Sequence, residues 1–187
     1  MTERNVKVLS LCLLIKHFTG EHILVGEQIY YSLPQVVLEA KTVFELQLTH
    51  CKLEPCNQFN FFHLKSLNLD DVYLDEQVIQ NLTLNRPLIE DFQLYNCHGF
   101  KHLKISNLPR LHLFYVESRI MVSRIEIEAP SLQTFSYQNN NTYQFQNEHC
   151  GFYLEACKNL KRLFVHDSMA DELLQNISSK FPTLEVS

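Results

Sequence analysis

Several residue types that catalyse reactions in other proteins stand next to one another in this sequence. His149 is followed by Cys150, a pairing suited to nucleophilic catalysis, and Asp70 is followed by Asp71, a pairing of carboxylates suited to acid–base catalysis. Successive side chains of a strand point to opposite faces, so neither pair can act together on a strand. We expect Asp70 on a strand face and Asp71 in the turn that follows.

The other candidates for catalysis or metal binding are weaker. Asp167 and Ser168 are residue types that begin helices. His98, His102 and His112 lie in separate segments without the spacing of a metal site. The four glycines form no phosphate-binding motif. The sequence therefore predicts a protein that is not an enzyme and that has no metal site and no cofactor.

The strongest feature is a repeated pattern, apolar-x-x-apolar-x-apolar. Its last two apolar residues alternate with polar ones, as in a strand with one buried face. The pattern has the following middle residues: Leu9, Leu46, Leu67, Phe92, Leu103, Leu111, Ile125, Phe135 and Leu163. When Leu9, Leu103 and Ile125 are left out, successive middle residues are 19 to 28 residues apart, close to the period of leucine-rich repeats.

One coil of this length cannot bury its own apolar strand face, whereas stacked coils bury these faces against one another. The sequence thus predicts one domain over residues 1–187, an α/β leucine-rich-repeat solenoid with a parallel concave sheet and few short convex helices. The units at Leu103 and Ile125 are expected as convex strands, and residues 16–28 as an insertion. Convex helices are expected at residues 75–82, 168–180 and, in a shorter form, 32–40.

The composition limits which kinds of partner and which cell compartment are expected for this chain. The chain has 187 residues and a net charge of −5, which does not suit a nucleic-acid face. Its longest strongly apolar stretch, residues 8–15, is too short to span a membrane. Six cysteines at irregular spacing, with no secretory signal, predict reduced thiols and a cytoplasmic or nuclear protein.

Three segments resemble the repeats of plant F-box/leucine-rich-repeat proteins. These are Leu64 to Val72, Pro87 to Cys97, which is similar to P-x-L-E-x-L-x-L-x-x-C, and Ile125 to Tyr137, which is similar to I-x-A-P-x-L-x-x-F-x-Y. The resemblance implies the substrate-recognition repeats of a ubiquitin-ligase receptor. In that family an F-box before the repeats docks the ligase adaptor.

The chain departs from that family at its ends. The repeat pattern already begins at Val6, with no F-box before it, and residues 181–187 repeat the lead-in to a further unit. We therefore expect a fragment that lacks the F-box and the C-terminal repeats or cap. It should engage the adaptor only through an F-box outside this chain.

A target protein is expected on the concave face, where the residues that alternate with the buried ones point. The residues expected on this face are Gln93, Tyr95, Arg110, His112, Phe114, Ser136, Arg162, Phe164 and His166. Aromatic residues and Arg are enriched at binding hot spots, so we expect a groove from Tyr95 to Phe114 with Arg110 as a charged anchor.

Three alternatives stay open at this stage. A parallel β-helix hydrolase acting on polysaccharide could use Asp70 and Asp91 as paired carboxylates on adjacent strands. A secreted leucine-rich-repeat receptor fragment is opposed by the missing signal and the missing L-x-G-x-I-P pattern. A decayed or competing repeat copy would bind targets without a ligase role.

Overall fold

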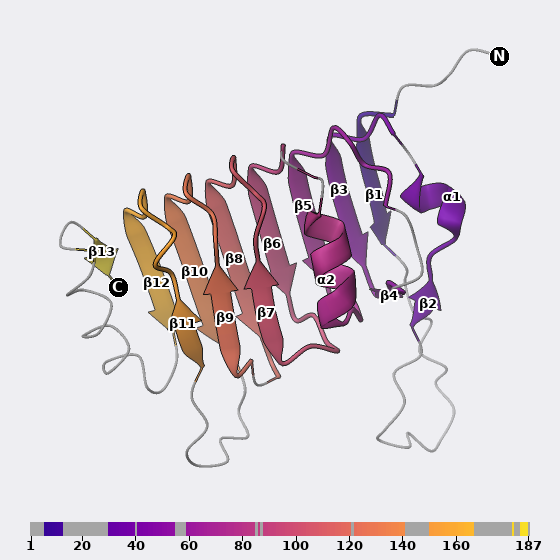
Figure 1. Ribbon diagram of the computed structural model, residues 1–187. Coiled ribbons are helices and arrows are strands. Elements are labelled where there is room, and N and C mark those ends of the chain that lie inside the picture. Colours follow the sequence, from indigo (N-terminus) through magenta and orange to yellow (C-terminus); the bar gives the residue numbers. More distant parts are fainter. Residues whose placement is uncertain are drawn as a thin grey trace, which may run out of the picture.

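The computed structural model describes residues 6–12, 30–39, 41–54, 59–84, 86, 88–120, 122–140, 150–166, 181 and 184–186. Within these ranges the chain winds in successive coils, and each coil adds one strand to a parallel sheet (Figure 1). In spatial order the eight strands are β1 (Val8–Cys12), β3 (Glu45–Thr49), β5 (Ser66–Asp70), β6 (Asp91–Tyr95), β8 (Leu113–Ser118), β10 (Thr134–Asn139), β12 (Arg162–His166) and β13 (Glu185–Val186). Spatial order follows chain order, which confirms the predicted solenoid.

Shorter elements cover the back of this sheet, which we call the back of the solenoid. They are β2 (Tyr31–Ser32), α1 (Gln35–Leu38), β4 (Cys51–Lys52), α2 (Glu76–Thr83), β7 (His102–Ile105), β9 (Arg124–Ile127) and β11 (Gly151–Tyr153). The strands β7, β9 and β11 form a parallel sheet of their own. The units at Leu103 and Ile125 predict β7 and β9, whereas β11 was not predicted. The helix expected at 168–180 and the insertion expected at 16–28 lie outside the described residues.

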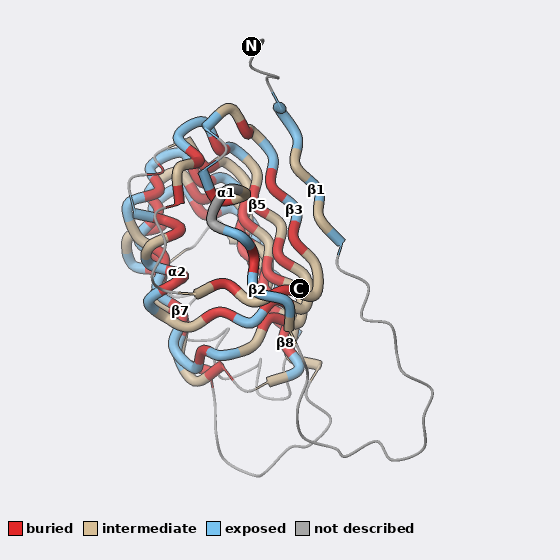
Figure 2. Tube along the Cα trace, turned by 90° about the vertical axis from the view of Figure 1, so that its right-hand side faces the viewer, coloured by how far each residue is buried: buried red, intermediate tan, exposed pale blue. Residues whose placement is uncertain are grey.

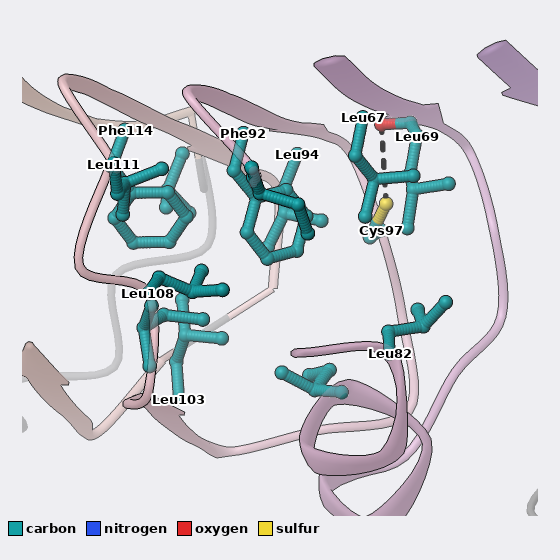
Figure 3. Close-up of a cluster of buried hydrophobic side chains, with 14 of the residues drawn as sticks. Leu67, Leu69, Leu82, Phe92, Leu94, Cys97, Leu103, Leu108, Leu111 and Phe114 are labelled. Carbon is teal, nitrogen blue, oxygen red and sulfur yellow. Dashed lines mark hydrogen bonds between the residues drawn. The ribbon is translucent and has the colours of Figure 1, made fainter. Parts of the chain in front are cut away.

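The core lies between the eight-stranded sheet and the back. Buried and less buried positions alternate along the sheet strands (Figure 2), since every second side chain points inward. Phe92 and Phe114 point from the sheet toward Leu103 and Leu108 of the back (Figure 3). All four side chains are buried. Each coil thus buries its apolar strand face only together with its neighbours.

Helix α2 forms where the sequence predicts it. The Asp75 side chain caps it by accepting a hydrogen bond of 2.8 Å from the backbone N–H of Val78. The apolar stripe of Val78, Ile79 and Leu82 is buried against the core. The Glu76 carboxylate accepts backbone N–H groups at the start of β7, and these bonds join the helix to the next coil.

Two cysteines are buried thiols, Cys51 in β4 and Cys97 shortly after the end of β6. The Cys97 Sγ donates to the Leu69 carbonyl oxygen at 3.4 Å (Figure 3). Burial raises the pKa of both Cys51 and Cys97 to about 12. Because only the thiolate is strongly nucleophilic, these two side chains act as packing groups.

The prediction for the coil around residues 108–114 is wrong. Strand β8 begins at Leu113, so Phe114 points inward and is 0% exposed, whereas the sequence pattern placed it on the concave face. Arg110 and His112 are exposed, but they lie in the turn before the strand.

A backbone turn sets this register. The Leu111 N–H donates to the Leu108 carbonyl oxygen, as the Leu132 N–H donates to that of Ala129 in the next coil. Leu111 is therefore the first apolar residue of its unit, equivalent to Leu132, and Phe114 is the middle one. Leu111, His112 and Leu113 alternate as in a strand, but the strand begins only at Leu113.

Gly99 is required by its backbone conformation. Its φ is +102°, and a Cβ atom there would lie 2.8 Å from the Leu74 carbonyl oxygen. We expect Gly99→Ala to lower the free energy of unfolding by about 1–2 kcal/mol, measured by urea denaturation. The matched control is Gly151→Ala. A Cβ atom there would lie 3.2 Å from the Tyr153 side chain, and the nearest backbone atom, the Ser123 carbonyl oxygen, would be 3.8 Å away. Equal stability of the two variants would contradict the strain argument.

Candidate binding surface

One side of the eight-stranded sheet points away from the core, and we call it the outer face. The strand register aligns its side chains in three rows that cross the sheet. From β3 to β12 the first row is Glu45, Ser66, Asp91, Leu113, Thr134 and Arg162. The second is Gln47, Asn68, Gln93, Tyr115, Ser136 and Phe164. The third is Thr49, Asp70, Tyr95, Glu117, Gln138 and His166. These side chains are exposed or partly exposed, so they are available to a partner.

Two tyrosines stand together at the middle of the outer face. The rings of Tyr95 and Tyr115 are 4.7 Å apart between centroids and tilted by 35°. The Tyr95 hydroxyl donates to Gln93 Oε1 at 2.8 Å, and the Tyr115 hydroxyl donates to Glu117 Oε2 at 3.0 Å. These contacts fix two partly exposed rings that have no core to fill, which is the form of an aromatic anchor.

The tyrosines belong to a wider polar network. Glu117 Oε1 also accepts a hydrogen bond of 2.9 Å from Asn140 Nδ2, while Gln138 Nε2 donates to Asn140 Oδ1 at 3.0 Å. Partial burial and the Glu117 carboxylate raise the pKa of Tyr115 to about 12. Partial burial also raises the pKa of Tyr95. Both hydroxyls therefore stay protonated as donors at neutral pH.

The structure brings together some of the residues predicted for the binding face and separates others. Gln93, Tyr95 and Ser136 lie at outer positions of β6 and β10. Arg162, Phe164 and His166 lie at outer positions of β12, with Phe164 40% exposed.

Strand β8 presents different residues from those predicted. Phe114 is in the core, and Arg110 and His112 are at the edge where the strands begin. Arg110 is thus not a charged anchor in the middle of the sheet. Leu113, Tyr115 and Glu117 take the outer positions of β8, and the sequence analysis missed all three.

A second polar cluster gathers around Asp71 in the turn after β5. Its carboxylate contacts His50 Nδ1 at 2.6 Å and His98 Nε2 at 3.0 Å, and it accepts the Tyr30 hydroxyl at 3.1 Å. Burial, followed by the Asp71 charge, raises the pKa of Tyr30, so this phenol remains a donor. The four side chains come from four segments, and the cluster therefore ties neighbouring coils together.

The described contacts of this cluster are not those of a nucleophile–base pair or of a metal site. Among the described residues, neither imidazole has a hydrogen bond to a Ser, Thr or Cys side chain. In the same part of the chain, no group of three or more His, Cys, Asp or Glu residues is arranged to hold a metal ion. The geometry fits a structural role in the turns.

The carboxylate pair of the hydrolase alternative is not formed. Asp70 ends β5 opposite Tyr95, whereas Asp91 begins β6 opposite Ser66. Four residues of register separate them, or about 13 Å along the strands. Paired carboxylates of glycosidases are at most about 9.5 Å apart, and those of retaining enzymes about 5.5 Å. The adjacent residues His149 and Cys150 were not expected to act together, and His149 lies outside the described residues.

Comparison with known proteins agrees with the stacked coils. The family described as "At1g61320/AtMIF1, LRR domain" matches residues 13–186. The chain belongs to this leucine-rich-repeat family. No curated protein and no solved structure matches the chain.

Membership of the leucine-rich-repeat family indicates a protein-interaction module. Repeat solenoids bind partners on the extended sheet surface that their coils build, and leucine-rich-repeat domains are typically non-catalytic. In this chain the outer face is the extended surface of the eight-stranded sheet. Among the described residues, none of the helices is long and apolar enough to cross a membrane.

Proposed function

We propose that this chain binds a target protein on its outer face, without catalysing a reaction, as the target-recognition repeats of an F-box-type ubiquitin-ligase receptor. The main observation in support of this binding is the Tyr95–Tyr115 pair. Both rings are partly exposed, held by hydrogen bonds and placed in the middle of the sheet. A fixed aromatic pair contributes contact area with little loss of side-chain entropy on binding.

The ligase role rests on the resemblance of the repeat motifs. Pro87 to Cys97 and Ile125 to Tyr137 are similar to the corresponding units of plant F-box/leucine-rich-repeat proteins. In such a receptor the repeats hold the target while an F-box holds the adaptor. We accordingly also propose a cytoplasmic or nuclear location, in keeping with the reduced cysteines that the sequence predicts.

The binding surface is tested with the variant Tyr95→Ser/Tyr115→Ser. Immobilised wild-type chain is used to capture proteins from a plant extract, and the captured proteins are identified by mass spectrometry. Proteins bound through the outer face should be lost from this double variant by about tenfold or more, because two anchors are removed. The melting temperature is measured alongside.

The matched control is Tyr153→Ser in β11, whose ring is 42% exposed at the back of the solenoid and lies under Arg124. This variant should capture the same proteins as the wild type. If the outer-face variant retains them, or the control loses them equally, the outer face is not the binding surface.

The ligase role needs a separate measurement on the product of the full-length transcript. An F-box should be encoded before the repeats, and the ligase adaptor should co-purify with the protein. A full-length product with neither would contradict the ligase role. Binding by the outer face is decided independently by the tyrosine variants.

A further inference from the structure

Charge is distributed unevenly over the outer face. The twelve outer positions of β3, β5, β6 and β8 carry four carboxylates and no Lys, Arg or His. These carboxylates are Glu45, Asp70, Asp91 and Glu117. Among the described outer residues, basic ones appear only on β12, where Arg162 and His166 lie. The half of the face that holds the tyrosine pair is therefore anionic.

These outer carboxylates differ from several acidic residues elsewhere in the described chain. Several acids on the back and before the sheet strands are paired with Lys: Lys104 contacts Glu126 at 3.3 Å and Glu128 at 3.1 Å, and Lys65 contacts Glu90 at 3.0 Å. On the outer face no described cation lies within ion-pair distance of Asp70 or Glu117. Glu117 accepts hydrogen bonds from Tyr115 and Asn140, but these donors are neutral and leave its charge uncompensated.

Two of the carboxylates flank one of the tyrosines. Asp70, Tyr95 and Glu117 are direct neighbours in the third row, each on the next strand of the sheet. Neighbouring strands are about 4.8 Å apart, so both carboxylates are within reach of a group that rests on the Tyr95 ring. Tyr115 packs against that ring from the second row, and its hydroxyl holds Glu117 in place.

An aromatic face with carboxylates on both sides matches one ligand chemistry. A guanidinium or ammonium group is attracted to the face of a tyrosine ring, and it forms charge-assisted hydrogen bonds with carboxylates. A neutral aliphatic side chain would leave both charges without a partner, and an anionic one would be repelled.

We propose that the outer face binds a cationic segment of its target, with an Arg or Lys side chain on Tyr95 between Asp70 and Glu117. This inference rests on the proposed function, since it names the chemistry of the partner of the same surface. The extended sheet gives room for an extended peptide whose successive basic residues reach the further carboxylates, Asp91 and Glu45.

The test uses the full chain and a fluorescein-labelled peptide of alternating Arg and Ser, with a Gln–Ser peptide for comparison. Fluorescence anisotropy gives the dissociation constants at about 0.05 M and about 0.3 M salt. The Arg peptide should bind more tightly than the Gln peptide, and salt should weaken its binding. Asp70→Asn/Glu117→Gln should weaken it by about tenfold or more.

The matched control is Glu126→Gln/Glu128→Gln, which removes the same number of charges from the back of the solenoid. It should change Arg-peptide binding by less than about twofold. Equal losses in the two variants would show attraction to the net charge alone and would overturn the proposal. Thermal melts of both variants identify any loss that comes from unfolding.

Two further outcomes would contradict the proposal of a cationic ligand but not the proposal that the outer face binds a protein. The first is no binding of the Arg peptide together with target capture that still depends on the tyrosine pair. The second is a dimer, detected by light scattering after size-exclusion chromatography, that dissociates in both Asp70→Asn/Glu117→Gln and Arg162→Gln. That result would assign the outer face to a second copy of this chain.

Discussion

Phe114→Ala is expected to lower the free energy of unfolding by about 3–5 kcal/mol, measured by urea denaturation. The side chain is 0% exposed. Its ring lies between two others in the core, with centroids 5.4 Å from Phe92 and 5.7 Å from Phe135. Removing the middle ring of this stack leaves a cavity between three adjacent coils. Each coil depends on its neighbours for burial, so the loss should affect the whole array.

The neighbouring residue provides the matched control. Tyr115→Ala removes a ring of similar size from the same strand, but from the outer face, and should cost only about 1 kcal/mol. Tyr115→Ala should reduce partner binding. Phe114→Ala should leave the binding of the folded fraction unchanged. The reverse result, a stable Phe114→Ala chain that has lost binding, would show that Phe114 faces outward, as the sequence pattern suggested.

The sequence was sufficient to predict most of the fold because each coil repeats one simple requirement. A strand with one buried face, repeated at a near-constant interval, has few solutions other than a stacked parallel sheet. Units midway between these strands had to lie on the other side of the coil, which is where β7 and β9 are found. The Asp75 cap and the apolar stripe of α2 are local signals, so they could also be recognised in the sequence.

The register of β8 was the exception, and its cause is local. Leu108, Leu111 and Leu113 satisfy the repeat pattern by spacing alone, but a turn from Leu108 to Leu111 delays the strand. A signal for this was present. Pro109 precedes Leu111 by two residues, as Pro130 precedes Leu132 in the next coil. Aligning these lead-ins, rather than the apolar triplets, gives the observed register and places Tyr115 outside.

The polar cluster around Asp71 was not predicted, for a different reason. His50 and Asp71 each follow the last residue of a strand, and His98 lies three residues beyond the end of β6. Their contacts depend on how the coils superpose in space, which no single segment reveals. Once the strand ends are aligned, however, His50 and Asp71 occupy equivalent turn positions and must be neighbours. Polar residues at such positions can therefore be examined as candidate contacts in advance.

Asp71→Ala is expected to lower the free energy of unfolding by about 2–4 kcal/mol. The carboxylate contacts His50 at 2.6 Å, His98 at 3.0 Å and Tyr30 at 3.1 Å, and its side chain is only 16% exposed. Its removal leaves these groups without their shared partner. It also places Ala at a φ of +49°, a conformation that Asp and Asn tolerate better. Urea denaturation at neutral pH measures the change.

Asp71→Asn separates the two contributions to this loss. Asn accepts the positive φ and keeps one oxygen acceptor, but it has no charge to hold the two imidazoles and the phenol together. Its cost should therefore be intermediate, about 1–2 kcal/mol. Tyr30→Phe combined with each variant tests whether the cluster acts as a unit, since the loss at residue 30 should be smaller once Asp71 is gone. A loss below about 0.5 kcal/mol for both Asp71 variants would contradict this account. The coil turns would then be held by their backbone hydrogen bonds alone.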